Sequence, residues 1–300
     1  MDDIKRMAVF AAVVEHHSMS AAARALSMST SAVSQQVRRL ERDSGVTLLH
    51  RSTRKLTLTA AGEQFHAHCA AMVAAARRAQ QQLTHSREAP VGELRLSAPV
   101  GFARHVAPAL GELLAAHPAL SLKLLVDDAH IDLIEARIDL AVRFGRLPDS
   151  SWVARRLCAF ELLVCASPEL LRSHGAPRRP EDLLSQPWLA LARDGQALHL
   201  SLQGPQGESR TQRIEARISS NNQLSIQQMC VAGLGLALLA RVDAADDLAA
   251  GRLVPVLPQW RCPSLDVWAA TPQRDAQPAK VRAAIDALAQ YLVGLPGAVR

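Results

Sequence analysis

One segment, residues 30–59, constrains the fold of this 300-residue chain more than any other part of it. Its first half repeats Val33, Val37 and Leu40 at helical spacing, which predicts a helix that turns this narrow stripe inward. Its second half alternates polar and apolar residues around a basic tip at residues 51–55, which predicts a β-hairpin. Together they indicate a small domain in which helices and a two-stranded wing share one core.

The opposite face of this predicted helix is polar and basic. It carries Ser31, Ser34, Gln35, Arg38 and Arg42. Short hydroxyls and an amide come first along the helix and arginines follow, which is the order that a helix needs to reach base edges and phosphates in a major groove of DNA. An ordinary amphipathic surface helix has the same pattern, so the face alone leaves both interpretations open.

Two shorter helices are predicted before this one. Asp2 or Asp3 can cap the first, which is expected to end near His16. Ser20 is expected to cap the second, over residues 21–26. The expected caps of the third helix are Ser29 or Thr30 at its start and Gly45 at its end. Two short helices, a polar-faced third helix and a basic hairpin make a winged helix-turn-helix.

Positive charge is concentrated in this N-terminal part. The chain holds 34 Lys and Arg against 28 Asp and Glu, a formal net charge of +6. Twelve basic and seven acidic residues precede residue 91, so the first part has a net charge of +5 and the remainder is nearly neutral. A basic surface on a small domain indicates a polyanionic partner such as nucleic acid, although a solvated charged face gives the same count.

Four motifs resemble the DNA-binding domain of LysR-type transcriptional regulators. They are SAAARAL at 20–26, SAVSQQVRRLE at 31–41, LHRSTR at 49–54 and LTAAG at 58–62. The resemblance is dense over residues 2–88 and looser over the rest of the chain. Met19 and Leu49 stand where the family usually has Phe, and Thr30-Ser31 stands where a Pro is common. The first two departures concern packing, and the third concerns which bases are read, so the operator sequence cannot be carried over.

The resemblance implies a transcriptional regulator that binds double-stranded DNA and responds to a small-molecule effector. It implies a homodimer or homotetramer and raises RNA polymerase as a further partner, with no enzymatic activity, metal or cofactor. The first domain is expected over residues 1–59. The expected DNA contacts are Ser29, Thr30, Ser31, Ser34, Gln35, Arg38, Arg42, Arg51, Thr53 and Arg54.

A long helix is predicted after the hairpin. Thr59 can cap it, and it is expected over residues 60–87, with the linker as a whole at 60–88. One seam repeats at heptad-like spacing through Phe65, Cys69, Met72, Ala76, Ala79 and Leu83. This seam predicts a dimerisation helix, and the resembling family pairs its linker antiparallel with that of a second copy. Packing against the chain's own body is the alternative.

Residues 91–300 alternate strand-like and helix-like segments, which predicts parallel α/β sheets. Strands are expected at 94–96, 120–126 and 140–142, and helices at 105–117 and 131–136. The effector domain of the resembling family is similar to periplasmic binding proteins, with two subdomains joined by crossing strands. The resemblance puts the crossings at 162–166 and 265–269, one subdomain at 91–163 with 267–293, and the other at 164–266.

Ligands of such sheets bind beyond the carboxyl ends of strands and at helix N-termini. The expected effector contacts are Ser97, Pro99, Val100, Gly101, Phe102, Asp128, Arg143, Phe144, Gly145, Ser219, Asn221 and Asn222. Arg143 stands out because an arginine in a cleft can hold a carboxylate or phenolate with two hydrogen bonds. A surface salt bridge for Arg143, and turn or cap duty for the others, are the alternatives.

Several other classes of protein are disfavoured. The longest apolar run, residues 229–240, is too short to cross a bilayer, and the first residues lack the basic region of a secretory signal. A cytoplasmic protein without a membrane partner is therefore expected. A metal site at His66, His68 and Cys69 is disfavoured, because residues two apart on a helix point away from each other.

Three competing hypotheses remain. A DNA-tethered enzyme lacks the usual nucleophile, metalloprotease and phosphate-loop motifs, and the glycines at 233–235 are interpreted as a helix-to-strand turn rather than a dinucleotide loop. A free small-molecule binding protein does not need the basic N-terminal part. A thiol sensor would use Cys158, Cys165 and Cys230, although each lies in an apolar stretch typical of inert core cysteine.

Overall fold

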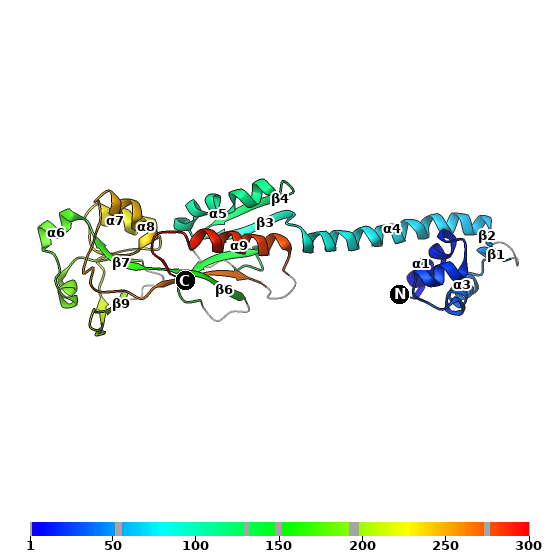
Figure 1. Ribbon diagram of the computed structural model, residues 1–300, viewed down its shortest axis with the longest axis horizontal. Coiled ribbons are helices and arrows are strands. Elements are labelled where there is room, and N and C mark those ends of the chain that lie inside the picture. The colour runs from blue at the N-terminus through cyan, green and yellow to red at the C-terminus, as the bar shows by residue number, and fades with distance from the viewer. Residues whose placement is uncertain are drawn as a thin grey trace. The chain divides into compact units, whose positions relative to one another are not determined.

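The computed structural model describes residues 2–51, 56–128, 132–147, 152–191, 198–272 and 277–299, with the Arg51 side chain left out. The chain divides into two compact units, Met1–His85 and Ser86–Arg300, and each is described by itself (Figure 1). No helix of the described residues is both long and apolar enough to cross a membrane.

The first unit contains short helices, a hairpin and most of a long helix. Its elements are α1 (Asp2–Glu15), α2 (Met19–Ala25), α3 (Thr30–Ser44), β1 (Leu49–Arg51), β2 (Leu56–Leu58) and α4 (Ala60–Glu88), which ends in the second unit. Strands β1 and β2 pair antiparallel, with Leu49 opposite Leu58. The predicted winged helix-turn-helix is confirmed, and so is the long helix that follows it.

Capping side chains fix where these helices begin and end. The Ser29 hydroxyl accepts a hydrogen bond from Ala32 N at 3.1 Å, and Gly45 ends α3 with a left-handed φ of 68°, as predicted. The predicted cap of α2 was wrong. Ser18, not Ser20, accepts from Ala21 N at 3.3 Å, so the helix begins two residues earlier than expected.

The core of the first unit joins all four helices and the wing. Phe10 of α1 is fully buried and packs on Phe65 of α4, with ring centroids 5.6 Å apart. The start of α4 approaches the base of the wing so closely that a Cβ atom on Gly62 would lie 2.1 Å from Leu48 O. Thr59 caps α4, because its Oγ1 accepts from Gly62 N at 2.9 Å. Only glycine suits this approach of α4 to the wing.

The second unit begins with a six-stranded sheet in the order β15-β6-β14-β5-β3-β4. Its strands are β3 (Gly92–Ala98), β4 (Leu120–Val126), β5 (Leu140–Phe144), β6 (Val153–Phe160), β14 (Leu265–Thr271) and β15 (Ala298–Val299). Strand β3 is parallel to β4 and β5, whereas β14 is antiparallel to β5 and β6. The sheet is therefore mixed and not wholly parallel. We call residues 92–160 and 265–299 the large lobe.

Two helices cover one face of this sheet. They are α5 (Ala103–Ala116), which follows the short helix η1 (Val100–Phe102), and α9 (Ala279–Leu292). The helices lie beside each other (Figure 1) and share one hydrophobic core with alternate residues of the strands. Along β5, Leu140 and Val142 enter this core, while Ala141 enters a separate cluster. Burial on both faces explains why the first three residues of the strand are all apolar.

The small lobe, residues 162–261, is built from shorter pieces. Its strands are β7 (Leu162–Ala166), β8 (Leu189–Leu191), β9 (Leu198–Gln203), β10 (Ser209–Ile214), β11 (Ile218–Ser220), β12 (Ala237–Ala240) and β13 (Val254–Pro255). Its helices are α6 (Pro168–His174), η2 (Pro180–Ser185), α7 (Gln223–Val231) and α8 (Arg241–Ala249). Strand β7 is the centre of a three-stranded sheet between β12 and β13. Gly233, with a φ of 79°, makes the predicted turn from α7 to β12.

Two expectations about this unit need correction. The helix predicted at 131–136 is wrong over its described residues, which form only turns, because Arg137 takes a left-handed φ of 52° directly afterwards. The predicted crossing strands are present as β7 and β14, but each belongs wholly to one lobe. The chain changes sheets at Glu161 and between β14 and residue 261.

Candidate functional site

The outer face of α3 carries polar side chains that no core contact holds. Gln35, Arg38 and Arg42 are exposed and Ser34 is half-buried, whereas the stripe of Val33, Val37 and Leu40 is buried. Ser29, Thr30 and Ser31 are exposed at the start of the helix. The Ser29 hydroxyl caps the helix and also lies 3.0 Å from Ser31 Oγ. The predicted polar face is therefore present and open to a ligand.

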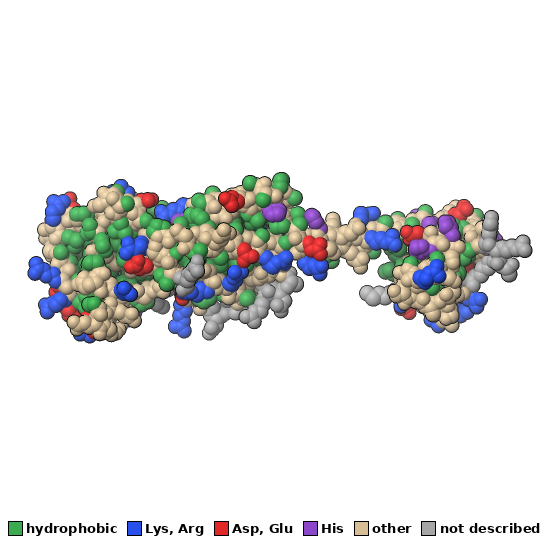
Figure 2. Space-filling model, viewed as in Figure 1, with side chains coloured by type: hydrophobic (Ala, Val, Ile, Leu, Met, Phe, Trp, Pro, Cys, Tyr) green, Lys and Arg blue, Asp and Glu red, His purple; other side chains and the backbone are tan. Residues whose placement is uncertain are grey.

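The two acidic residues of α3, Glu41 and Asp43, both have partners away from the outer face of the helix. Glu41 Oε1 accepts hydrogen bonds from Leu48 N at 2.9 Å and Leu49 N at 3.1 Å, and so fixes the start of the wing. Asp43 pairs with Arg6 of α1. Figure 2 shows Lys and Arg side chains around α3 in the first unit. Because the two carboxylates have partners, the outer face of α3 presents a net positive field to a polyanion.

The tip of the wing lies outside the described residues. This covers Thr53, Arg54 and the side chain of Arg51, all of which the sequence predicts to contact DNA. Its base is described: Arg51 pairs with Leu56 across the hairpin, directly before the tip.

The predicted seam of α4 divides into two parts. Its first residues, Phe65 and Cys69, pack in the core of the first unit, as the alternative interpretation expects. Ala76 and Ala79 are exposed, and Leu83 is 74% exposed. Only the second part of the seam is thus available to another chain. In the disfavoured metal triplet, Cys69 is buried while His68 is exposed.

A cavity of about 280 Å³ lies between the two lobes of the second unit. Walls come from both lobes, with Phe102, Phe144 and Phe160 on one side and Leu189 and Leu238 on the other. This volume lies just below the range that ligand pockets in proteins span, roughly 300–1,000 Å³.

Half of the predicted effector contacts line this cavity. Those that do are Pro99, Gly101, Phe102, Asp128, Phe144 and Asn221. Those that do not are Ser97, Val100, Arg143, Gly145, Ser219 and Asn222. The second group has structural partners instead. Gly145, for example, accepts a hydrogen bond from Trp268 Nε1 at 2.8 Å through its carbonyl.

Arg143 does not point into the cavity. Its guanidinium is buried and donates to Val142 O at 3.2 Å and to the hydroxyl of Ser97, itself fully buried, at 3.3 Å. The predicted role of Arg143 as a carboxylate clamp requires an exposed fork of N–H donors, which this position does not offer.

Asp128 and Asn222 join the lobes beside the cavity. Asp128 Oδ1 accepts from Val100 N at 3.0 Å, and Oδ2 accepts from Asn222 Nδ2 at 2.7 Å. Asn222 also caps α7, since its Oδ1 accepts from Ser225 N at 2.9 Å. Both predicted residues therefore lie at the cleft. Asp128 lines the cavity, and Asn222 does not line it but is hydrogen-bonded to Asp128.

A second polar group bridges the lobes through α5 and α8. Arg104 of the large lobe donates to Asp243 Oδ1 and to Val242 O, both at 3.0 Å. Burial raises the pKa of Asp243, and the charge of Arg104 opposes that shift. Burial, together with the charge of Arg104, lowers the pKa of His105 to about 4. The His105 Nδ1 atom lies 3.1 Å from the Tyr291 hydroxyl.

Sequence reasoning missed most of the small-lobe wall. The unpredicted lining residues are His105, Phe160, Leu162, Leu189, Leu191, Leu198, Gln223, Leu238, Ala240, Val242, Asp243 and Leu265. Most are ordinary strand residues, and nothing in their local pattern marks them as facing a cavity. Val242 and Asp243 are exceptions, because they lie in the first turn of α8, and helix N-termini are places where ligands bind.

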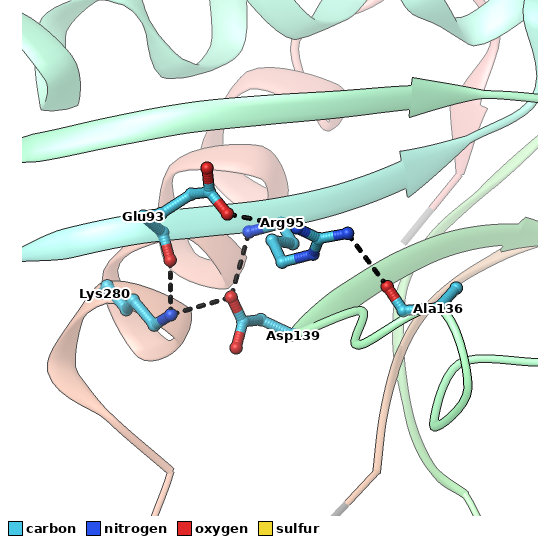
Figure 3. Close-up of polar contacts among 5 residues, drawn as sticks. All are labelled: Glu93, Arg95, Ala136, Asp139 and Lys280. Atoms are coloured by element: carbon cyan, nitrogen blue, oxygen red, sulfur yellow. Dashed lines mark hydrogen bonds and ion pairs between the residues drawn. The ribbon is translucent and has the colours of Figure 1, made fainter.

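A charged cluster of the large lobe has a structural role (Figure 3). Asp139 Oδ2 accepts from Arg95 N at 2.9 Å and from Lys280 Nζ at 2.7 Å. Arg95 in turn donates to Glu93 Oε1 at 3.2 Å and to Ala136 O at 3.1 Å. These contacts fasten the turn before β5 to β3 and α9, and none of the five residues lines the cavity.

The cysteines are held in their protonated form. Burial raises the pKa of Cys165 and of Cys230 to about 12, and that of Cys158 to about 11. The Cys230 thiol donates to Cys165 O at 3.4 Å. Because the thiolate is the reactive form, this environment counts against a thiol sensor built on these three residues.

Comparison with known families assigns both units. A family described as "Bacterial regulatory helix-turn-helix protein, lysR family" matches residues 4–63, and one described as "LysR substrate binding domain" matches residues 87–293. The chain is 34% identical over 298 residues to the HTH-type transcriptional regulator PtxR of Pseudomonas aeruginosa, covering 97% of this chain and 93% of PtxR. It is also 34% identical to the HTH-type transcriptional activator AaeR of Escherichia coli, covering 98% and 95% of the two chains.

Solved structures agree over nearly the whole chain. Full-length AphB, a virulence activator of Vibrio cholerae, is similar with a TM-score of 0.71 and 28% identity, covering 96% of this chain and 98% of AphB. CrgA of Neisseria meningitidis is similar with a TM-score of 0.59 and 30% identity, covering 95% and 97%. The chain therefore belongs to the LysR family of transcriptional regulators, which bind DNA, carry an effector-binding domain and are not enzymes.

Proposed function

We propose that the outer face of α3 reads the operator. Gln35 and Arg38 are exposed along this face, and Ser34 lies on it nearer the helix start. Small and amide side chains near the start of the helix suit contacts with base edges, while Arg38 and Arg42 reach bases or the adjacent phosphates. The observation that supports this proposal most directly is that the polar face is exposed to solvent while the opposite, apolar stripe of α3 is buried.

In this proposal the wing contacts the sugar-phosphate backbone of the DNA. Arg51, Thr53 and Arg54 flank or occupy the tip of a two-stranded hairpin whose base is paired. Side chains in such a position can lie on phosphates or enter the neighbouring minor groove. The proposed DNA-binding domain covers residues 1–59, and the linker covers residues 60–88.

The cavity of the second unit is the proposed effector site. The proposed effector domain covers residues 91–300, with subdomains at 91–163 and 267–293 and at 164–266. Walls from both lobes support this role, because a ligand between them contacts both at once. An effector acts only if it binds one arrangement of the lobes more tightly than another, and that difference is what changes DNA binding or promoter activation.

The exposed end of α4 is the proposed pairing surface. Ala76, Ala79 and Leu83 continue the heptad-like seam beyond the residues that the first unit buries. A second copy that covers this stripe would bring two α3 helices to two half-sites of one operator. The protein is then a homodimer, or a homotetramer with further contacts, that acts on DNA in the cytoplasm and affects RNA polymerase at the promoter.

A duplex-binding experiment tests the DNA-reading surface. Arg38→Ala is compared with Arg78→Ala, because both remove one exposed arginine from the first unit and only Arg38 lies on the α3 face. With a duplex from the promoter region of the protein's own gene, R38A is expected to weaken binding by about five- to hundredfold, as for loss of a base contact, while R78A leaves it nearly unchanged. Equal affinities of R38A and R78A would count against the proposed surface.

The same assay separates the wing from the helix. Arg51→Ala with Arg54→Ala is expected to weaken binding to every duplex and to lower the salt slope by about two, because two phosphate contacts are lost. Substitutions at Ser34 or Gln35 are expected to change the preference among duplexes instead. A wing variant that binds as the unmodified protein does would contradict the wing's role.

A further inference from the structure

The walls of the cavity between the lobes are mainly hydrocarbon. Three phenyl rings, of Phe102, Phe144 and Phe160, come from the large lobe. Leucine side chains face them from the small lobe, including Leu191 and Leu238. Such walls favour an apolar ligand, because its burial there removes apolar surface from water on both sides.

Three of the polar side chains on the walls, those of Asp128, Asp243 and His105, already have protein partners. Both oxygens of Asp128 accept hydrogen bonds, from Val100 N and Asn222 Nδ2. The Asp243 carboxylate is paired with Arg104 at 3.0 Å. His105 lies within hydrogen-bond distance of the Tyr291 hydroxyl, and Arg104 Nε donates to its Nε2 at 3.2 Å. A ligand therefore finds few unfilled hydrogen-bonding positions on these groups.

No cationic side chain lines the cavity within the part of the chain that the structure describes. Arg143 is directed to Ser97 and to a carbonyl, and Arg104 is held by Asp243 outside the lining. Asp128 and Asp243 are the acidic side chains on the described wall. His105 is uncharged there, since burial lowers its pKa to about 4.

We propose that this cavity takes an uncharged, largely apolar molecule and discriminates against anions. The inference rests on the proposed role of the cavity as the effector site and names the chemical class that it accepts. A carboxylate would lose its hydration without gaining a cationic partner, and it would lie beside two acidic side chains whose hydrogen-bond donors are already in place. An ammonium group would compete with donors that Asp128 and Asp243 already have, so it gains little there.

The test uses the full chain and a fluorescent reporter of apolar cavities, N-phenyl-1-naphthylamine. Three competitors share one ring system and differ in charge: 2-naphthalenemethanol, 2-naphthoate and 2-naphthylmethylamine. The alcohol is expected to displace the reporter at a concentration roughly tenfold or more below that of the naphthoate, because only the carboxylate is desolvated without a partner. The amine is expected to be weaker than the alcohol as well.

Two variants tie the result to this cavity. Leu191→Trp places a larger side chain on the wall from a position that is 40% exposed, so it is expected to abolish the reporter signal without unfolding the lobe. Asp243→Asn removes one negative charge and the partner of Arg104, so it is expected to reduce the disadvantage of naphthoate. Arg193 lies between the lining residues Leu191 and Leu198 in the sequence, outside the described residues, so Arg193→Gln is the control for a cation there and is expected to leave the order of competitors unchanged.

The outcomes are separable. The proposal is overturned if naphthoate displaces the reporter as well as the alcohol does, or if the amine displaces it best. It is also overturned if R193Q changes the concentration of naphthoate needed to displace the reporter. Reporter binding that persists in L191W, or no reporter binding at all, would show that the cavity is not the site of such a ligand. The same samples are tested for duplex binding, so a cavity that binds the alcohol without any change in duplex affinity shows a failure of the proposed effector role and not of the ligand class.

Discussion

Asp128 of the large lobe accepts a hydrogen bond from the side-chain amide of Asn222 in the small lobe, at 2.7 Å. Each residue also holds its own lobe together. Asp128 accepts from Val100 N, and Asn222 caps α7. The pair therefore couples the backbone around η1 to the start of α7, on the wall of the cavity. A ligand that changes the separation of the lobes must stretch or break this bond, which makes it a sensitive point for the coupling.

Asn222→Ser separates the two roles of this residue. Serine keeps a good helix cap but lacks an amide that reaches Asp128. A hydrogen bond to a charged group contributes about 1.5–3 kcal/mol, less for a half-buried pair, so the thermal transition of the effector part is expected to drop by a few degrees. Differential scanning calorimetry of the full chain measures the change.

Asn221→Ser is the matched control for this prediction. Asn221 lines the cavity but is exposed, and it does not cap α7. Its replacement is expected to leave the transition within about a degree of the unmodified protein, as for most surface changes. Equal transitions for N222S and N221S would show that the Asp128–Asn222 bond does not stabilise the arrangement of the lobes.

The positions of Asp128 and Asn222 relative to the predicted strands and helices marked both as cleft residues, but they did not predict that the two side chains form a hydrogen bond. Asp128 follows a strand and Asn222 precedes a helix, so each was placed near a cleft by its local context. Their contact depends on how two lobes meet, and that is set by residues 94 positions apart in the chain. The same limit explains Arg143, which was expected after a strand but lies within β5, with its side chain turned inward to Ser97.

His105 gives the effector part a defined pH dependence. Its folded pKa of about 4 lies below the ordinary 6.5, so protons bind preferentially to the unfolded chain below pH 6.5. The free energy of unfolding is therefore expected to fall as pH drops from 6.5 towards 4, by about 2 kcal/mol at pH 5 from this group alone. Burial makes the effect sizeable, since the residue is only 8% exposed.

The contribution of His105 to this pH dependence is separated from that of other titrating groups by comparison with the variant His105→Gln. Urea unfolding at pH 7 and pH 5 is expected to show a smaller loss of stability for H105Q than for the unmodified protein, because glutamine takes up no proton. Other groups titrate alike in both proteins, so they cancel in the difference. Identical losses in the two proteins would mean that His105 is not held in its neutral form.

Helix periodicity predicted the elements of the first unit well, and capping details less well. The buried stripe of α3, its cap at Ser29 and its end at Gly45 follow from local rules that act within a few residues. The start of α2 was misplaced because Ser18 and Ser20 are both good caps by type, and Ser18 is the one whose side chain accepts from the helix. The close contact of Gly62 with Leu48 O was not predictable, since it depends on how α4 meets the wing.

Gly62→Ala tests that contact. A Cβ atom 2.1 Å from a backbone oxygen cannot be accommodated by a side-chain rotation, so α4 or the wing must shift. Overpacking of this kind costs about 1–3 kcal/mol or more, and the shift is expected to weaken duplex binding because it moves the wing. Gly111→Ala in α5 is the control, since its Cβ meets open space and helix propensity favours alanine by up to about 1 kcal/mol. Thermal melts in which G62A and G111A move the same way would contradict the packing described here.

The last prediction concerns the exposed stripe of α4, formed by Ala76, Ala79 and Leu83. Leu83 is 74% exposed on a helix whose earlier seam residues are buried in the first unit, and such a side chain gains from cover by a second copy. Leu83→Glu is expected to raise the dimer dissociation constant by about tenfold or more, because a desolvated carboxylate without a partner disfavours the contact. Gln82→Glu adds the same charge one residue away, off the seam, and is expected to have a much smaller effect. Light scattering across a dilution series measures both, and equal dissociation constants for L83E and Q82E would place the pairing surface elsewhere on the chain.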